Sequence, residues 1–102
     1  MNPFLGIWRG EDEYLSEVEY TVTEKNGEVS VAARDPSDGE SADVSGVSLA
    51  DGRLRFMALW SSTGRAAQCV FELEEENTVL LTFTYTDHAR LVRMPFGNSG
   101  NA

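Results

Sequence analysis

The chain is poor in the residues that most often carry chemistry. Its 102 residues include one cysteine, Cys69, and one histidine, His88. A single cysteine cannot form an internal disulfide, and a lone histidine in an expected turn has no partner with which to bind zinc. The sequence therefore predicts neither a disulfide-stapled domain nor a metal centre, and we expect no cofactor.

Long apolar runs and basic residues are also scarce. The longest apolar runs, such as residues 79–81, fall far short of the roughly 20 residues that a membrane helix needs. Eight basic residues stand against seventeen acidic ones, and the net charge of −9 repels phosphate backbones and anionic lipids. We therefore expect no nucleic-acid partner and no membrane association, and the lack of a signal-peptide pattern predicts a cytoplasmic location.

Patterns typical of catalysis are missing too. Residues 46–50 lack the second glycine of a nucleophile elbow. Glu72 and Glu74 share a strand face that should point outward, so they do not resemble a buried acid–base pair. We predict that the protein is not an enzyme and that it has no catalytic residues.

Acidic residues gather around Gly39, but not in the pattern of a calcium loop. The residues are Asp35, Asp38, Glu40 and Asp43. Their spacing differs from that of an EF-hand, and Pro36 interrupts the stretch. A hydrated acidic loop is favoured over a calcium site, and no metal ligands are predicted.

Alternating apolar and polar residues dominate the rest of the chain. This period of two is typical of strands with one buried face, and helical spacing is hardly seen. Asn26-Gly27 and Asp51-Gly52 are the dipeptides that tight hairpins prefer, whereas residues 35–41 contain proline and predict the longest loop. Counting the opening segment and a final strand near residues 89–94, the pattern predicts eight short strands.

An all-β fold follows, with the strands in an eight-stranded antiparallel meander. Closing or nearly closing the meander into a lipocalin-like barrel would remove its two exposed edges, and we expect that arrangement. The length suits a single domain, assigned to residues 1–96. Residues 97–102 contain nothing that could pack, and they are predicted to be a disordered tail.

The opening Gly6-Ile7-Trp8, together with Arg93 on the expected last strand, resembles the calycin group of lipocalins, fatty-acid-binding proteins and their bacterial relatives. The resemblance implies that Trp8 plugs one end of the barrel and that Arg93 packs across its ring in a cation–π contact, with Arg90 as a second candidate. Residues 4–11 also look like the start of nitrobindin-type haem barrels, for which His88 is the single possible axial ligand.

The residues predicted to face inward decide whether such a barrel has room for a ligand. Small residues such as Ala58, Ala67, Gly46 and Ser48 could leave a pocket, whereas bulky aromatic residues could fill the interior. A filled core and a small apolar cavity both remain open. If a small apolar ligand binds, the expected binding residues are Tyr20, Phe56, Trp60, Phe71, Phe83 and Tyr85.

An apolar set is predicted on the outer face of the second half of the chain. Val47 and Leu49 belong to it, and its centre is formed by Met57, Leu59, Val70 and Leu80. Apolar patches of this kind mark partner surfaces. The alternative to ligand binding is therefore an interaction or structural module with a filled core, which forms a homodimer through these four residues.

Overall fold

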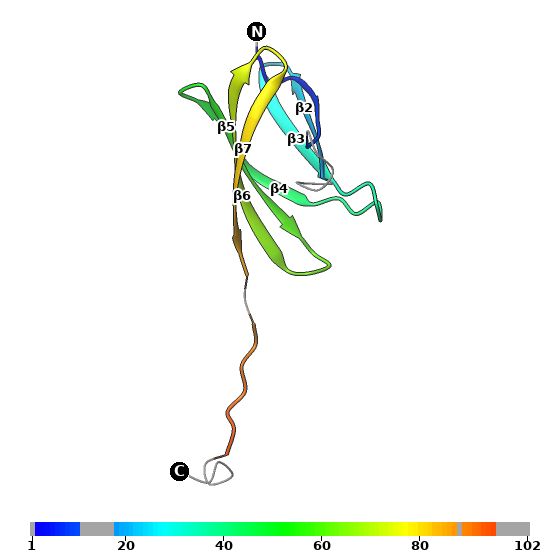
Figure 1. Ribbon diagram of the computed structural model, residues 1–102, viewed down its shortest axis with the longest axis vertical. Coiled ribbons are helices and arrows are strands. Elements are labelled where there is room, and N and C mark those ends of the chain that lie inside the picture. Colours follow the sequence, from blue (N-terminus) through cyan, green and yellow to red (C-terminus); the bar gives the residue numbers. More distant parts are fainter. Residues whose placement is uncertain (1, 11–17, 88, 96–102) are drawn as a thin grey trace.

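The computed structural model describes residues 2–10, 18–87 and 89–95. Within them the chain forms strands and no helix, so the all-β prediction is confirmed, and no described segment is a helix long and apolar enough to cross a membrane. The described residues form seven strands rather than the expected eight; Figure 1 shows their arrangement. They are β1 (Gly6–Trp8), β2 (Glu19–Lys25), β3 (Glu28–Arg34), β4 (Asp43–Ala50), β5 (Arg53–Trp60), β6 (Arg65–Glu75) and β7 (Thr78–Thr86).

The strands form two antiparallel sheets in which spatial order follows sequence order. One sheet has the order β1-β2-β3 and the other β4-β5-β6-β7. Asn26 and Gly27 both have positive φ, 56° and 79°, and Asp51 and Gly52 have 54° and 73°. These are the angles of type I′ turns, which match the twist of the flanking strands. Both hairpins predicted from these dipeptides are confirmed, whereas the predicted single meander of eight strands is divided into two sheets.

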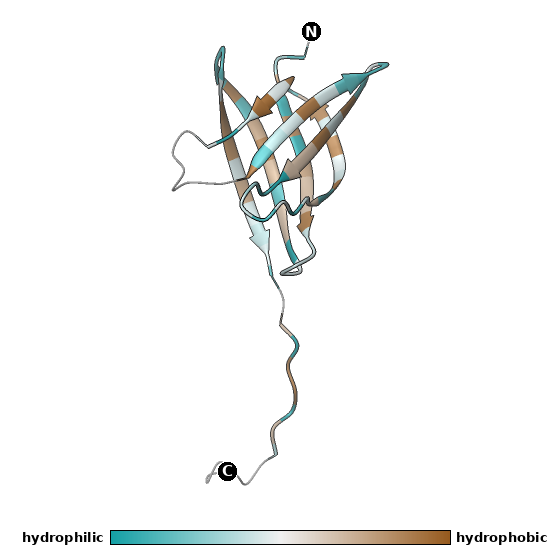
Figure 2. Cartoon of the chain, turned by 90° about the vertical axis from the view of Figure 1, so that its right-hand side faces the viewer, coloured by the Kyte–Doolittle hydropathy of each residue, from teal (hydrophilic) through white to brown (hydrophobic). Residues whose placement is uncertain are grey.

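The two sheets meet along one side, where β3 leads into β4. An isolated bridge joins Arg34 to Ser41, and the Ala42 amide donates to the Ala33 carbonyl at 2.9 Å. From this seam the sheets curve around a shared interior (Figure 2). The seam therefore holds β3 and β4 beside each other without a continuous ladder.

The predicted closure of the barrel is wrong. β1 and β7 are the outermost strands of their sheets, and no pairing between them is found in the described part of the chain. The eighth strand expected near residues 89–94 is absent as well: residues 89–95 are unpaired and run away from the sheets (Figure 1). The expected eighth strand would have six residues, whereas β1 has only three. Pairing with β1 would therefore leave backbone N–H and C=O groups of that strand without hydrogen-bond partners.

A cluster of aromatic rings fills the interior at one end. Phe71 lies at its centre, with ring centroids 6.4 Å from Phe4, 5.5 Å from Tyr20 and 5.6 Å from Phe56. Trp8 stands edge-on to Phe71 at 6.5 Å and donates from its Nε1 to the Phe4 carbonyl at 2.7 Å. The opening segment thus packs against both sheets and joins them.

Arg93 does not lie on a last strand. It belongs to the exposed, unpaired segment 89–95, as does Arg90. The aromatic neighbour of Trp8 in the structure is Phe71, which comes from the middle of β6. The inferred closure of a barrel by Arg93 over Trp8 fails together with the eighth strand that was to carry it.

A bulge in β4 changes which of its residues face inward. Val44 lies opposite the buried Ala58, and Leu49 lies opposite the buried Leu54, although the two residues are five positions apart and would face opposite sides of a regular strand. The register shifts between Ser45 and Ser48, around Gly46 with its φ of 64°. Contrary to the prediction, Val47 packs against the core and Leu49 shares the face of Leu54. Ser48 instead lies beside Arg55 on the outer face.

Candidate functional site

The six residues predicted to bind a ligand fall into two groups, and the first group is buried. Tyr20, Phe56 and Phe71 are at most 8% exposed, and the three ring centroids lie between 5.5 and 5.8 Å apart. Rings at this distance are in van der Waals contact and leave no room for a molecule between them. At this end the interior is filled.

The second group, Trp60, Phe83 and Tyr85, lies where the interior opens. Phe83 pairs with Cys69 and Tyr85 with Ala67, so both rings share the face of buried residues. They are nevertheless 45% and 47% exposed, because β7 is the last strand of its sheet and none of the described strands pairs with its outer edge. Their rings contact each other edge-on at 5.4 Å.

The volume of the buried side chains falls along β6 toward this open end. The inward row runs from Phe71 through Cys69 to Ala67, and the neighbouring row of β5 runs from Phe56 to Ala58. Beyond these small residues the rows end at Arg65 and Trp60, which lie opposite each other. The taper leaves space beside the Trp60 indole.

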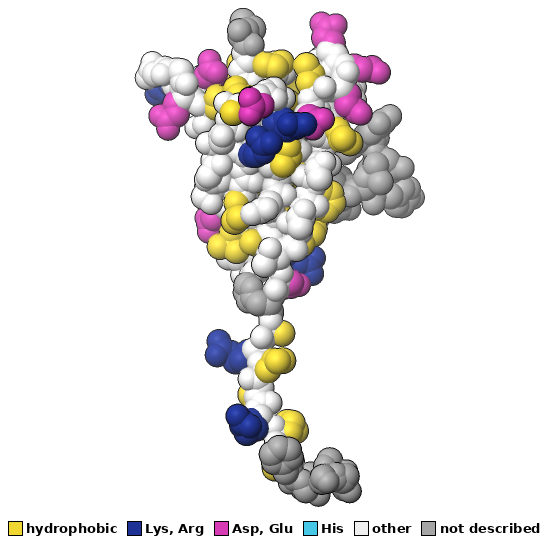
Figure 3. Space-filling view, turned by 90° about the vertical axis from the view of Figure 1, so that its left-hand side faces the viewer, with side chains coloured by type: hydrophobic (Ala, Val, Ile, Leu, Met, Phe, Trp, Pro, Cys, Tyr) yellow, Lys and Arg dark blue, Asp and Glu magenta, His cyan; other side chains and the backbone are white. Residues whose placement is uncertain are grey.

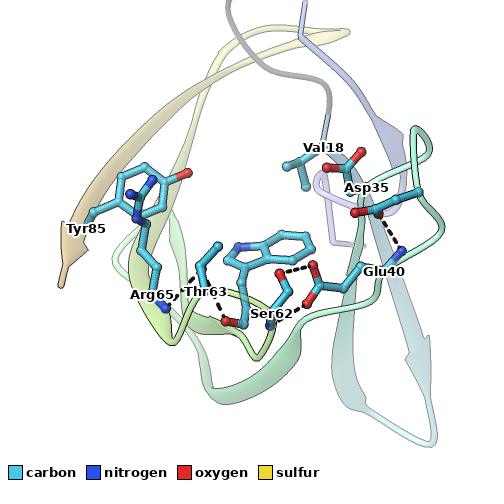
Figure 4. A pocket seen from close by; sticks show the side chains of 9 residues that line it. Val18, Asp35, Glu40, Ser62, Thr63, Arg65 and Tyr85 are labelled. Atoms are coloured by element: carbon cyan, nitrogen blue, oxygen red, sulfur yellow. Dashed lines mark hydrogen bonds between the residues drawn. The ribbon is translucent and has the colours of Figure 1, made fainter. Parts of the chain in front are cut away.

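A pocket of about 270 Å³ occupies that space. Figure 4 shows Tyr85 and Arg65 on one side of it and Asp35 and Glu40 on the other. The strand ends of β5, β6 and β7 and the loop between β3 and β4 all contribute. The lining residues are Val18, Asp35, Asp38, Glu40, Trp60, Ser62, Thr63, Arg65 and Tyr85.

The acidic side of the pocket is held by its own hydrogen bonds. Asp35 accepts from the amide and the hydroxyl of Ser37 at 2.9 and 2.6 Å, which holds the pKa of its carboxyl below the usual value. Asp38 accepts from the Glu40 amide at 2.8 Å. These bonds fix the shape of the loop. No cluster of metal-binding side chains is found among the residues that the structure describes.

Glu40 ties this loop to the turn between β5 and β6. Its carboxylate accepts from the Ser62 amide at 3.0 Å and from the Ser62 hydroxyl at 2.7 Å. The two residues are 22 positions apart in sequence. Glu40 lies in the loop between β3 and β4, and Ser62 lies in the turn between β5 and β6. The pair therefore bridges the rim of the pocket and sets its width on that side.

Arg65 defines the opposite side and was not singled out from the sequence. Its guanidinium carbon lies 5.1 Å from the Tyr85 ring centroid, and its Nη2 lies 3.4 Å from Asp87 Oδ2. A charged residue at the end of an inward row must lie at the mouth of the interior, where water can reach it. A signal in the sequence was available: Arg65, Ala67 and Cys69 occupy alternate positions of one strand, so they share a face.

Burial opposes the ionisation of two groups in the core, the Tyr20 hydroxyl and the Cys69 thiol. Burial, followed by the proximity of Cys69 and Tyr85, raises the pKa of the Tyr20 hydroxyl far above its usual range. Burial also raises the pKa of the Cys69 thiol, which is 1% exposed. A protonated, inaccessible thiol is a poor nucleophile. His88, the possible haem ligand, lies outside the described residues.

The predicted interface residues do lie on the outer face, and each has a polar residue directly opposite it on a neighbouring strand. Met57 pairs with Gln68, Val70 pairs with Arg55 and Thr82, and Leu80 pairs with Glu72. Leu59 and Leu80 are 40% and 48% exposed, while Met57 and Val70 are half-buried. By register, the four side chains form a diagonal line across β5, β6 and β7 that is flanked by polar residues, rather than a broad apolar patch.

Comparisons with known proteins leave the site to be interpreted from its own geometry. No protein-family model, no curated protein and no solved structure matches the chain.

Proposed function

We propose that the protein binds a small aromatic or apolar molecule in the pocket at the open end, with the Trp60 indole as the main contact. The observation that carries this proposal is the position of the pocket beside Trp60 and Tyr85, at the end where the aromatic core stops. A binding site commonly combines an apolar surface with a few polar groups that orient the ligand.

The dimensions and charges of the pocket narrow the ligand class. Its volume of about 270 Å³ lies just below the usual range for drug-sized ligands, so a molecule of one or two rings fits best. Asp35, Asp38 and Glu40 line one side, whereas the charge of Arg65 is shared with Asp87. A neutral or cationic ligand is therefore favoured over an anionic one.

The alternative, self-association through Met57, Leu59, Val70 and Leu80, has weaker support. An interface core is depleted in charge, yet Arg55 and Glu72 lie among these side chains. The resemblance of residues 6–8 to the start of calycins adds to the ligand-binding proposal, since that group binds small apolar molecules inside its barrels.

The test uses the fluorescent probe 6-propionyl-2-(dimethylamino)naphthalene, which is neutral and has two fused aromatic rings, within the size that the pocket favours. Probe emission is titrated against the wild-type chain, Trp60→Ala and Leu59→Ala. The two variants are matched: the residues are neighbours on β5, but Trp60 lines the pocket and Leu59 faces outward. Loss of one aromatic contact worth about 1.5 kcal/mol weakens binding about tenfold in Trp60→Ala. Leu59→Ala should bind like the wild type.

Two outcomes would contradict the proposal. One is equal probe affinity in the wild type and Trp60→Ala. The other is a loss of affinity in Leu59→Ala as large as that in Trp60→Ala, which would move binding to the outer face. Circular dichroism of each variant shows whether the fold is intact before the titration is interpreted.

A further inference from the structure

Residues 89–95 leave the end of β7 as an extended, unpaired chain whose apolar side chains face water. Leu91, Val92 and Met94 are 88%, 76% and 73% exposed. Figure 3 shows apolar and basic side chains following one another along this segment. An extended segment with apolar residues on each face has the composition of a strand without a sheet.

We propose that residues 89–95 of one copy pair with the free edge of β7 in a second copy of this chain, and that the exchange is reciprocal. The dimer would be two-fold symmetric, with each copy supplying the strand that the other lacks. This inference does not depend on the proposed ligand.

The free edge of β7 suits such an addition. β7 is nine residues long, carries no charged residue and no proline, and pairs only with β6 among the described residues. Natural edge strands are usually blunted by charges, prolines, bulges or short length. β1, at the other edge, is protected by its length of three residues. The long edge of β7 has none of these devices, and Leu80, Phe83 and Tyr85 along it are nearly half exposed.

The route of the chain favours a second copy over the same copy. Asp87 and His88 would have to form the tight turn that brings the segment back onto its own β7. The other tight turns of the chain place glycine or asparagine second, as in Asn26-Gly27, Asp51-Gly52 and Glu76-Asn77, whereas here the second residue is histidine. In the structure the segment continues away from the sheets (Figure 1). In the proposed dimer, a two-fold axis lies near the end of β7, and the β7 strands of the two copies run antiparallel to each other. Residues 89–95 of each copy then lie along the free edge of β7 in the other copy.

Charge supports the same pairing. The segment carries Arg90 and Arg93 and no acidic residue, so with a whole-chain charge of −9 the remainder carries −11. Two remainders of that charge repel each other, and the basic segments offset this repulsion where they cross to the partner. Because Tyr85 lies near the end of β7 and lines the pocket, the partner's segment would also border the pocket's open side.

The experiment is sedimentation velocity of the full chain at about 100 μM, with two proline variants, Leu91→Pro and Val92→Pro. Successive backbone N–H groups of a strand point to opposite sides, so at least one of the two prolines removes a ladder hydrogen bond. We expect a wild-type dimer and a monomer in at least one variant. Ser99→Pro, outside the seven residues, is the matched control and should remain a dimer.

Three results would overturn the inference. Amide hydrogen exchange distinguishes two ways in which a wild-type monomer could arise. Rapid exchange of the amides in residues 90–94 would show that the segment pairs with nothing, and slow exchange would show that it folds onto its own copy. A dimer that survives both prolines would place the interface elsewhere, such as the outer face. Probe binding at Trp60 is measured separately, so failure here leaves the proposed function untouched.

Discussion

Leu54 and Leu49 form a matched pair that tests the bulge in β4. They lie directly opposite each other on β5 and β4, yet Leu54 is 0% exposed and Leu49 is 41% exposed. The perturbation is leucine to alanine at each position in turn. Because residue type and sheet face are shared, the difference between the two variants reports burial.

The expected costs follow from the carbon atoms removed. Leucine to alanine deletes three carbons, worth about 2.4 kcal/mol at about 0.8 kcal/mol each. At Leu54 a cavity adds to this term, which gives a loss of about 3–4 kcal/mol in the free energy of unfolding. At Leu49 about three-fifths of the side chain is buried and solvent fills the space, so the loss is about 1.4 kcal/mol.

Urea denaturation followed by circular dichroism measures both free energies, and thermal melts give a second estimate. The difference of about 2 kcal/mol corresponds to about 8–16 °C in Tm for a chain of this size. A cost below about 0.5 kcal/mol at Leu49, as for an ordinary surface residue, would refute the register shift at Gly46. An equal loss of unfolding free energy at the two positions would refute the greater exposure of Leu49, which lies on the outermost strand of its sheet.

Two further predictions concern the backbone and the buried thiol. At Gly46 no atom lies within 4 Å of an added Cβ, so Gly46→Ala should lower the free energy of unfolding only by the left-handed backbone strain, about 1–2 kcal/mol. Gly46→Asn should cost less, because asparagine tolerates this conformation better. Equal Tm values for both variants and the wild type would contradict this. Because the pKa of Cys69 is raised in the folded chain, the native state holds its proton when the unfolded chain releases it, and stability should fall as pH rises above about 9. Cys69→Ala should lose less stability between about pH 9 and 10, as measured by urea denaturation; parallel curves for the two proteins would contradict the assignment.

Most of the strands could be predicted from the period-two pattern, because one buried face forces it. Tyr20 and Val22 in β2, and Phe56 and Phe71 in the second sheet, are buried as the alternation predicts. β4 was predicted wrongly beyond Gly46, since a bulge adds one residue without changing the composition around it. Alternation alone cannot locate such an insertion.

The eighth strand failed for a different reason. Residues 89–94 have strand-like composition, but pairing depends on the edges available, and the length of β1 cannot be seen in the apolar pattern of residues 4–8. For the six predicted ligand-binding residues, the alternation predicts the sheet face of each ring but not which rings touch. Parity predicted that all six rings face inward, while which of them touch each other depends on strand register, which brings Tyr20, Phe56 and Phe71 together.

The position of Phe71 constrains the order in which this protein can fold during synthesis. Its ring contacts Phe4 from the segment before β1, Trp8 and Tyr20 from the first sheet, and Phe56 from the second. The ribosome delivers the first sheet before β5 and β6, and until Phe56 and Phe71 emerge the apolar face of β1–β3 lacks the two rings that cover Tyr20. Early chains therefore expose Tyr20 and Val22, and stable native structure can begin only after most of the chain has been made.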